Sequence, residues 1–170
     1  DIRIFKGIEA DILADGAMDY PDEILATFDF VIASVHSRFN LSEEDQTRRI
    51  CRALANPFVT MLGHATGRLL LSRDAYRVNM TKVLDAAAEH KKIVEINANP
   101  HRLDLDWRLC GYAKAQGVQF SINPDAHSTD GLADVPFGVN VARKGGVTVG
   151  DVVNTLPVEA IASRLQAMRR

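Results

Sequence analysis

The sequence has too few cysteines, too little excess charge and too short apolar runs for several classes of protein. Its 170 residues include only two cysteines, far apart in the chain, so we expect neither a disulfide scaffold nor a cysteine metal site. Lysine and arginine number 20 against 22 aspartate and glutamate, so no strongly basic nucleic-acid surface is indicated. No apolar run approaches the ~20 residues of a membrane helix, and the N-terminus lacks a signal-peptide pattern. These absences favour a cytoplasmic protein with no membrane partner.

Short runs of β-branched and apolar residues alternate with longer helical patterns along the whole chain. This alternation is typical of an α/β fold whose strands are parallel and buried on both faces. No linker or low-complexity segment divides the chain, so we expect a single domain over 1–170. The expected strands cover 2–12, 28–35, 58–62, 92–96 and 118–122, and the expected helices cover 20–25, 42–55, 79–90, 105–116, 139–144, 149–156 and 158–169.

Polar residues follow the expected strands at regular intervals. Glu9, His36, His64, Asn97 and Asp125 recur about every 30 residues, which is the length of one unit of a βα barrel. The carboxyl ends of barrel strands converge on one mouth, where active sites are built. His127, two residues after Asp125, can face the same mouth. We therefore expect Glu9, His36, His64, Asp125 and His127 to lie together.

Three imidazoles and two carboxylates form a mixed nitrogen and oxygen ligand set. This set suits Zn²⁺, Mn²⁺ or iron better than a site for Ca²⁺ or Mg²⁺ made only of oxygen ligands. Clustered cations clamp a phosphate ester and lower the pKa of a bound water, which then attacks phosphorus as hydroxide. We expect no catalytic side chain beyond that metal-activated water. The alternative is that the three histidines are satisfied polar residues at strand ends.

Other polar residues are better explained by local structure. His90 is expected at a helix C-terminus, where a positive charge complements the helix dipole. His101 follows an Asn-Pro pair in a loop, where a surface position is favoured over a substrate contact. Asp11 and Asp15 are interpreted as turn residues.

Several segments of the sequence match the motifs of a known family in order. They are GIEADIL (7–13), ASVHS (33–37), GHATGR (63–68), EINANP (95–100) and NPDAHS (123–128), with two further segments, RLDLDW (102–107) and GVNVARK (138–144). The first five together resemble the PHP (polymerase and histidinol phosphatase) domain, and the two further segments strengthen the match to the form found at the C-terminus of bacterial family X DNA polymerases.

The resemblance implies a distorted (β/α)₇ barrel with a trinuclear metal site. By this resemblance Glu9 bridges two metals, His36 and His64 complete one of those sites, Asp125 ligates the other bridged metal, and His127 belongs to the third. The implied cofactors are divalent ions, manganese or zinc, with iron and magnesium as alternatives. The implied activity is a 3′–5′ exonuclease or related phosphodiesterase acting on DNA 3′ ends in base excision repair, within the parent polymerase. Residues expected to bind substrate are Arg68, Asn99 and Ser128.

The sequence departs from the family pattern in several places. It lacks the His-x-His pair of the family's first strand and the histidine that ends the second strand. We therefore expect a barrel that lacks about its first two strands, in a domain that is incomplete at its N-terminus. The exposed edges of such a barrel are expected to let copies of the chain associate. Pro124 and Ala65 replace the family's usual threonine and proline, but neither position is a metal ligand.

Two other functions remain open from the sequence. One is a small-molecule phosphatase of the histidinol-phosphatase type, which would use the same metal site with a different pocket. The other is a structural module of the polymerase without turnover.

Overall fold

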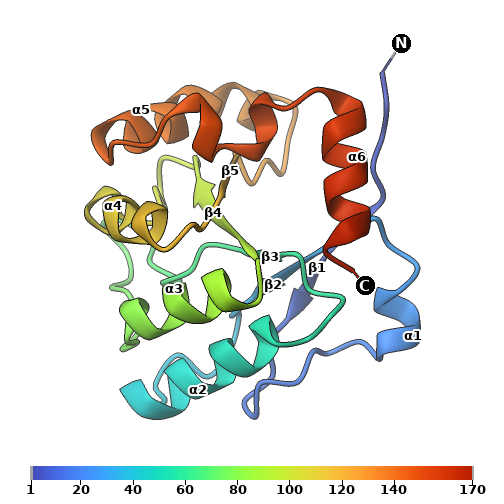
Figure 1. The fold of residues 1–170 in the computed structure, drawn as a ribbon. Helices are drawn as coiled ribbons and strands as arrows, with labels where there is room; N and C mark the ends of the chain where they lie inside the picture. Colours follow the sequence, from blue (N-terminus) through green and yellow to red (C-terminus); the bar gives the residue numbers. More distant parts are fainter. Residues whose placement is uncertain (1, 170) are drawn as a thin grey trace.

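The computed structural model describes residues 2–169, which form an α/β fold around a parallel five-stranded sheet (Figure 1). Neighbouring strands in the sheet are also neighbours in sequence, so the carboxyl ends of all five strands lie at the same edge. This result confirms the expected α/β class. The strands are β1 (Gly7–Asp11), β2 (Phe30–Ser34), β3 (Met61–Leu62), β4 (Ile93–Asn97) and β5 (Phe120–Asn123).

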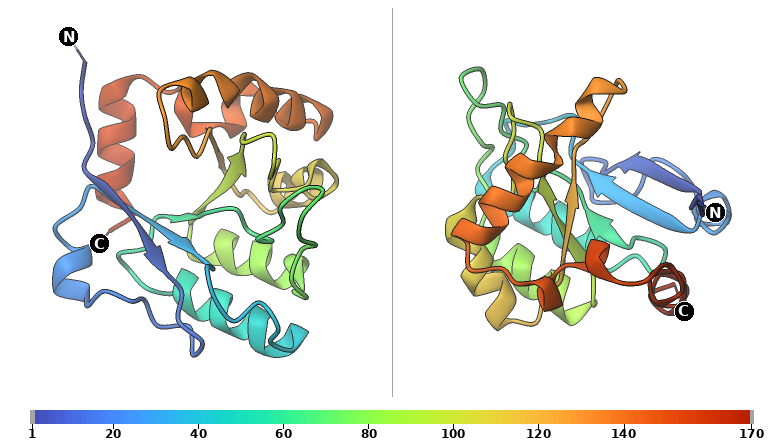
Figure 2. Two further views of the ribbon diagram at one scale, coloured as in Figure 1. Left: turned by 180° about the vertical axis from the view of Figure 1, so that it is seen from behind. Right: turned by 90° about the horizontal axis from the view of Figure 1, so that it is seen from above.

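The helices alternate with the strands and lie mainly on one side of the sheet. Helices α2, α3, α4 and α5 form a row along that side, whereas α6 lies on the other side (Figure 1). The short helix α1 precedes β2, and its Leu25 belongs to the same core as α2 to α5. Helix α6 runs beside the N-terminal segment (Figure 2), where Arg3 forms an ion pair with Glu159 at 3.3 Å. Within residues 2–169, every helix is too short or too polar to cross a bilayer. The helices are α1 (Asp22–Leu25), α2 (Glu43–Leu54), α3 (Met80–Glu89), α4 (Trp107–Ala115), α5 (Val135–Lys144) and α6 (Val158–Ala167).

Side-chain caps fix where three of these helices begin. Ser42, Asn79 and Asp106 each precede a helix and accept a hydrogen bond from a backbone N–H of its first turn. Such bonds satisfy donors that have no partner inside the helix. Because each cap ends the loop that follows a strand, the caps also limit the conformations of the loops at the carboxyl edge.

The two faces of the sheet pack against different neighbours. Ala10, Val31 and Ile96 belong to a large core between the sheet and helices α2 to α5. A second, smaller core on the opposite face contains Met61, Ile93 and Val153. Side chains alternate between faces along a strand, so Glu9 in β1 projects from the face opposite to Ala10. Glu9 therefore points to the side that the row of helices does not cover.

The expectation that every strand is buried on both faces is wrong for β1 and β2. All five residues of β4 are buried, but Gly7 and Glu9 of β1 are exposed, and Phe30 and Ile32 of β2 are half-buried. The reason is that helices α2 to α5 cover only one face of the sheet here. This open face leaves room for the polar side chains described below.

The expected helix over 149–156 is also wrong. The structure has two short 3-10 turns there, η2 (Val149–Asp151) and η3 (Val153–Thr155). Between them the chain returns to extended backbone at Val152, which forms a parallel bridge with Phe120. The Asn154 side chain then donates to the Ile122 carbonyl at 3.0 Å and accepts from the Ile122 N–H at 2.7 Å. Bonding to the outer edge of β5 thus takes precedence over helix formation.

A further 3-10 turn, η1 (Asp130–Asp134), precedes α5, which begins four residues before the expected helix start at 139.

Lys92 at the start of β4 gives the fold a testable dependence on pH. The side chain is buried, and its ammonium donates to the carbonyls of Val59 at 2.6 Å and Asn56 at 3.0 Å. Burial lowers the pKa of Lys92 to about 8 in the folded protein. Between that pH and about 10.4, the unfolded chain holds a proton that the folded protein has released, so the free energy of unfolding rises with pH.

We predict that Lys92→Met removes this rise, which we expect to be about 2–3 kcal/mol. Urea unfolding at pH 7.5 and pH 10 measures it, with Lys82→Met on the exposed face of α3 as the control. An equal rise in wild type and Lys92→Met would contradict the assignment to this ammonium.

Candidate metal centre

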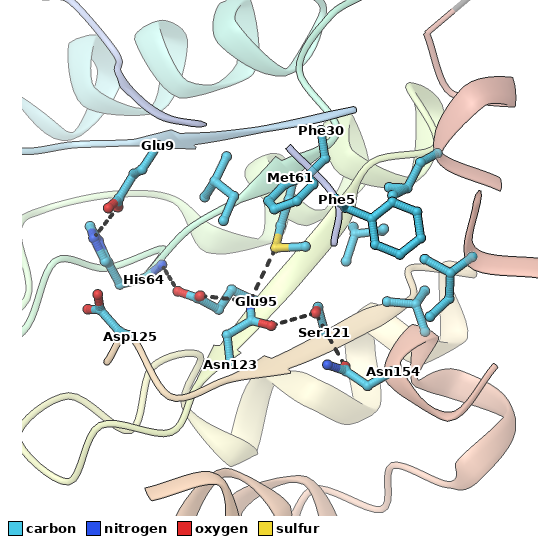
Figure 3. Close-up of a pocket in the computed structure, with 15 residues that line it drawn as sticks. Phe5, Glu9, Phe30, Met61, His64, Glu95, Ser121, Asn123, Asp125 and Asn154 are labelled. Carbon is cyan, nitrogen blue, oxygen red and sulfur yellow. Dashed lines mark hydrogen bonds and ion pairs between the residues drawn. The ribbon is translucent and has the colours of Figure 1, made fainter. Parts of the chain in front are cut away.

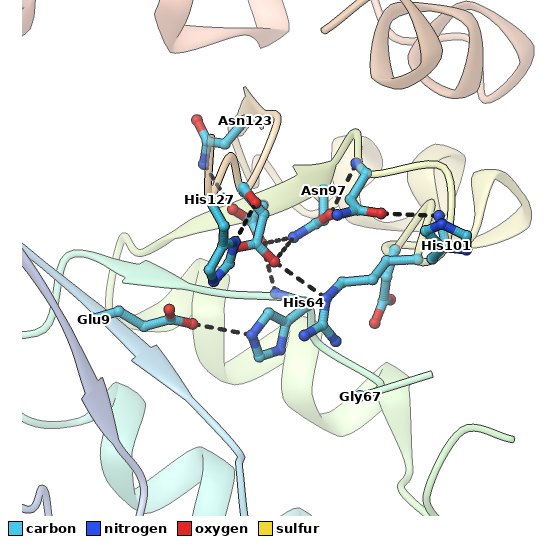
Figure 4. Close-up of polar contacts among 12 residues, drawn as sticks. Glu9, His64, Gly67, Asn97, His101, Asn123 and His127 are labelled. Carbon is cyan, nitrogen blue, oxygen red and sulfur yellow. Dashed lines mark hydrogen bonds and ion pairs between the residues drawn. The ribbon is translucent and has the colours of Figure 1, made fainter. Parts of the chain in front are cut away.

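Glu9, His36 and His64 bring three ligand atoms together at the carboxyl edge of the sheet. Glu9 lies within β1, His36 lies two residues beyond the end of β2, and His64 follows β3. The Glu9 Oε1 atom is 3.0 Å from His64 Nε2 and 3.4 Å from His36 Nε2, and the two Nε2 atoms are 3.3 Å apart. Among residues 2–169, this is the group of His, Cys, Asp and Glu side chains whose geometry suits a metal ion. Figure 4 shows the contact between Glu9 and His64.

The spacing of these atoms fits a divalent transition metal. Metal–nitrogen and metal–oxygen bonds of about 2.0–2.2 Å place neighbouring ligand atoms about 3.0–3.4 Å apart in octahedral or tetrahedral coordination. The three measured separations fall in this range. Neutral imidazole nitrogens and a carboxylate oxygen are all electron-pair donors, so three of them this close require a shared cation or proton. The donor set and its spacing therefore fit a divalent metal.

Asp11 fixes the orientation of the His36 ring. Its Oδ1 atom is 2.6 Å from His36 Nδ1, so that nitrogen donates to the carboxylate and Nε2 faces Glu9 and His64. Carboxylate–imidazole pairs of this kind orient the histidines that bind metals in proteins. The interpretation of Asp11 as a turn residue is wrong, because Asp11 is the last residue of β1 and pairs with Ser34 of β2. Sequence reasoning missed that Glu9 and Asp11 are two positions apart, a spacing that places both carboxylates on one face of β1.

Glu9 and His36 each stabilise the charged form of the other. Hydrogen bonds from His36 and His64 hold the pKa of Glu9 well below its usual range. The hydrogen bond to Glu9 raises the pKa of His36 to about 9, with a further contribution from Asp11. Glu9 therefore stays ionised, and a proton on His36 balances part of the negative charge of Glu9 and Asp11.

A buried carboxylate, Glu95 of β4, holds the backbone at His64. Its Oε2 atom accepts the His64 N–H at 2.7 Å and the Asn97 Nδ2 at 3.1 Å, and its Oε1 atom accepts the Asn123 Nδ2 at 2.9 Å. Burial raises the pKa of Glu95, and the three donors offset the cost of burying the group. The buried Asp104 carboxylate similarly accepts from the backbone and hydroxyl of Thr66 at 2.8 and 2.9 Å. The loop that carries His64 is therefore held at two points.

Gly63 allows this loop to lie close to β2. A Cβ atom at position 63 would be 2.4 Å from Ser34 Oγ and 2.8 Å from Ile32 Cγ2. Both contacts are too short for any larger residue. The glycine before His64 is therefore a steric requirement for placing this histidine next to Glu9.

Asp125 and His127 lie beside the group of three but do not join it. Asp125 lines the same cavity, of about 280 Å³, as Glu9 and His64 (Figure 3). Its Oδ2 atom is bonded to Asn97 Nδ2 and to Arg102 Nε, both at 3.1 Å. The His127 side chain is 85% exposed, and its Nδ1 lies 2.8 Å from the Asp125 carbonyl oxygen. The expected single cluster of five is therefore divided into three converging side chains and two neighbouring residues.

The backbone at Asp125 adopts an uncommon conformation. Its φ angle of 51° lies in the left-handed region, which few residues other than glycine adopt, although aspartate tolerates it. Strain of this kind is frequent where a side chain must point in a particular direction. Here it accompanies a carboxylate that faces the cavity, only 15% exposed.

The residues expected to bind substrate occupy three different environments. Arg68 uses its guanidinium inside the protein, donating to the Arg102 carbonyl at 2.9 Å, to Asp106 at 2.9 Å and to the Leu103 carbonyl. Asn99 lines a pocket next to Asp125, and Ser128 is exposed. A role of Arg68 in orienting phosphate stays a prediction, but its donors already have partners. Arg102, which sequence reasoning did not single out, is the arginine that contacts Asp125.

No family model matches the chain, but several curated proteins do. The DNA polymerase/3′-5′ exonuclease PolX of Bacillus subtilis is 40% identical over 166 residues, which cover 98% of this chain and 29% of that protein. A probable phosphatase of Caldanaerobacter subterraneus is 35% identical, covering 99% of this chain and 68% of its own length. A probable phosphatase of Thermoanaerobacter pseudethanolicus is 31% identical, covering 91% and 64%. The chain thus spans less than a third of PolX and about two thirds of these phosphatases.

The hydrogen bond between Asp11 and His36 predicts a defect in metal binding. We expect Asp11→Asn to weaken binding of Mn²⁺ or Zn²⁺ by about 10–100-fold, because the amide no longer holds the imidazole in one orientation. Competition titration against a chelator measures the affinity. Asp15→Asn is the matched control, since Asp15 lies in the following loop and pairs with Arg52 instead. Equal metal affinity in Asp11→Asn and wild type would show that the hydrogen bond has no such role.

Proposed function

Because the chain belongs to the PHP (polymerase and histidinol phosphatase) family of phosphoesterases, in the form shared with the C-terminal part of bacterial family X DNA polymerases, we propose that it is a metal-dependent phosphoesterase acting on DNA 3′ ends. The observation that carries this proposal is the convergence of Glu9, His36 and His64 within 3.4 Å of one another. The relative named as a 3′-5′ exonuclease supports the choice of DNA. The relatives named as probable phosphatases support hydrolysis of a phosphate ester.

Divalent cations are the cofactors of the proposed reaction, and manganese or zinc are the ions we favour. Glu9, His36 and His64 would hold one ion, and Asp125 and His127 would contribute to the further ions of a trinuclear site. Ions bound there polarise a phosphate oxygen and lower the pKa of a water molecule. The histidine-rich donor set supports manganese, zinc or iron over calcium.

The protein's own residues have distinct tasks in this proposal. Asp11 keeps the Nδ1 proton on His36, so that Nε2 stays available as a ligand. Glu95 fixes the backbone of His64, and Asn97 connects Glu95 to Asp125. These hydrogen bonds preorganise the ligands, so little rearrangement is needed when the substrate binds.

We also propose that residues 1–170 are one PHP domain whose sheet is part of a distorted (β/α)₇ barrel. Five consecutive parallel strands with their helices support this architecture. Base excision repair, within a polymerase of the PolX type, is the process in which such an activity would act.

The proposal predicts that His36→Ala eliminates hydrolysis while the fold is retained. We expect activity on a 3′-recessed DNA duplex to fall by more than about 100-fold, because losing a ligand costs more than losing one of its hydrogen-bond partners. His90→Ala at the C-terminus of α3 is the control, and circular dichroism checks the fold. Removing metal with a chelator should have the same effect on wild type, and added Mn²⁺ should restore activity.

Comparing hydrolysis of DNA with hydrolysis of histidinol phosphate separates the proposed function from the two alternatives. Hydrolysis of histidinol phosphate but not of DNA would support a small-molecule phosphatase and contradict the proposed substrate. Unchanged activity in His36→Ala would contradict the role of His36. No hydrolysis of either substrate by the metal-loaded wild-type protein would favour a structural module.

A further inference from the structure

A second pocket opens beside the candidate metal centre, and Glu9, His36 and His64 are not part of its wall. It has a volume of about 380 Å³ and is formed by the loops that follow β3, β4 and β5. It is therefore at the carboxyl edge of the sheet, as are the metal-binding candidates, and Asp125 and His127 belong to its wall. Figure 4 shows His101 on the side of Asn97 away from Glu9. The other residues that the argument uses are Leu69, Leu70, Asn99 and Arg102.

The polar part of the pocket favours an anion. Arg102 is half-buried and uses only Nε in its contact with Asp125, at 3.1 Å. Among the hydrogen bonds of residues 2–169, none involves its two Nη groups. His101 and His127 add ring nitrogens, whereas the only acid in the wall is Asp125, which pairs with Arg102 and accepts a hydrogen bond from Asn97. A guanidinium whose two Nη groups remain available as donors is suited to bind a phosphate group.

The position of Arg102 is fixed by its surroundings. The Arg68 guanidinium donates to the Arg102 carbonyl at 2.9 Å and also pairs with Asp106. The Leu70 N–H donates to the His101 carbonyl at 2.6 Å, which joins the loop after β3 to the loop after β4. These bonds hold the backbone, and the bond from Nε to Asp125 restrains the side chain, so the guanidinium loses less conformational entropy when it binds a ligand.

Leu69 and Leu70 give the pocket an apolar part beside its polar residues, and Leu70 is 36% exposed. A phosphate group alone gains nothing from contact with apolar side chains. A nucleotide also carries a sugar and a base, which can pack against the two leucines. The cavity on the other side of Asp125 lacks a permanently charged cation and is lined mostly by residues such as Phe30, Met61 and Ile93, so it is less suited to a charged strand.

From these observations, and on the basis of the proposed function, we propose that the loop pocket binds the nucleotide next to the scissile bond, with Arg102 contacting its phosphate. A nucleic-acid strand then fills both the metal centre and the pocket. A small phosphate monoester fills only the metal centre. Arg102 thus determines specificity for a DNA strand over a small monoester.

The test compares Arg102→Gln with wild type on two substrates in Mn²⁺, a short single-stranded oligodeoxynucleotide and p-nitrophenyl phosphate. We expect KM for the oligonucleotide to rise about tenfold or more, and to rise by a larger factor than KM for the monoester. Arg108→Gln is the matched control, because Arg108 is exposed and pairs with Asp106 in the same segment. Arg102→Lys should recover part of the loss, since it restores the charge.

A binding measurement without metal keeps this test independent of the proposed reaction. In EDTA, fluorescence anisotropy of a labelled oligodeoxynucleotide should show weaker binding to Arg102→Gln than to wild type or Arg108→Gln. An equal fall in kcat on both substrates, without a change in oligonucleotide binding, would mean that Arg102 only positions Asp125 and would overturn the pocket assignment. If wild type hydrolyses neither substrate, the proposed function fails, but loss of binding in Arg102→Gln alone would still support the pocket.

Discussion

The sequential parallel order of the strands is the constraint on which the site depends. Each strand pairs with the next one in the chain, so the carboxyl ends of all five lie at one edge. Residues as distant in sequence as Glu9 and His64 therefore come within 3.0 Å of each other. The helices stack on one face, which leaves Glu9 free to project from the other. Glu9 is partly exposed and pairs with His36, so the pairing offsets part of the desolvation cost of gathering these polar groups at one edge.

Buried carboxylates offset part of that cost by holding the ligands in place. Glu95 and Asp104 are both buried and both accept hydrogen bonds from the segment 64–66. Burial raises the pKa of each carboxyl group, and the hydrogen bonds that each accepts offset part of the desolvation cost. Asn97 links Glu95 to Asp125, which connects the His64 side of the site to the side where the loop pocket lies. The two sides are thus parts of one hydrogen-bonded edge.

The sequence predicted the α/β class and the meeting of Glu9, His36 and His64, because strand periodicity and residue type carry that information. Loop-determined features were not predictable in the same way. The positions of Asp125 and His127 depend on a left-handed backbone at Asp125 and on Arg102, neither of which leaves a periodic signal. The turns at 149–155 also escaped prediction, since the amide of Asn154 bonds to an edge strand distant in sequence. Arg68 and Arg102 look equivalent in the sequence, and only the fold shows which one has free donors.

Anomalous X-ray scattering from crystals of the manganese-loaded protein tests the central claim most directly. We expect a peak about 2.0–2.2 Å from Glu9 Oε1, His36 Nε2 and His64 Nε2 at once. A manganese ion bound elsewhere, or three side chains that separate with no ion between them, would contradict the assignment of this group as a metal centre.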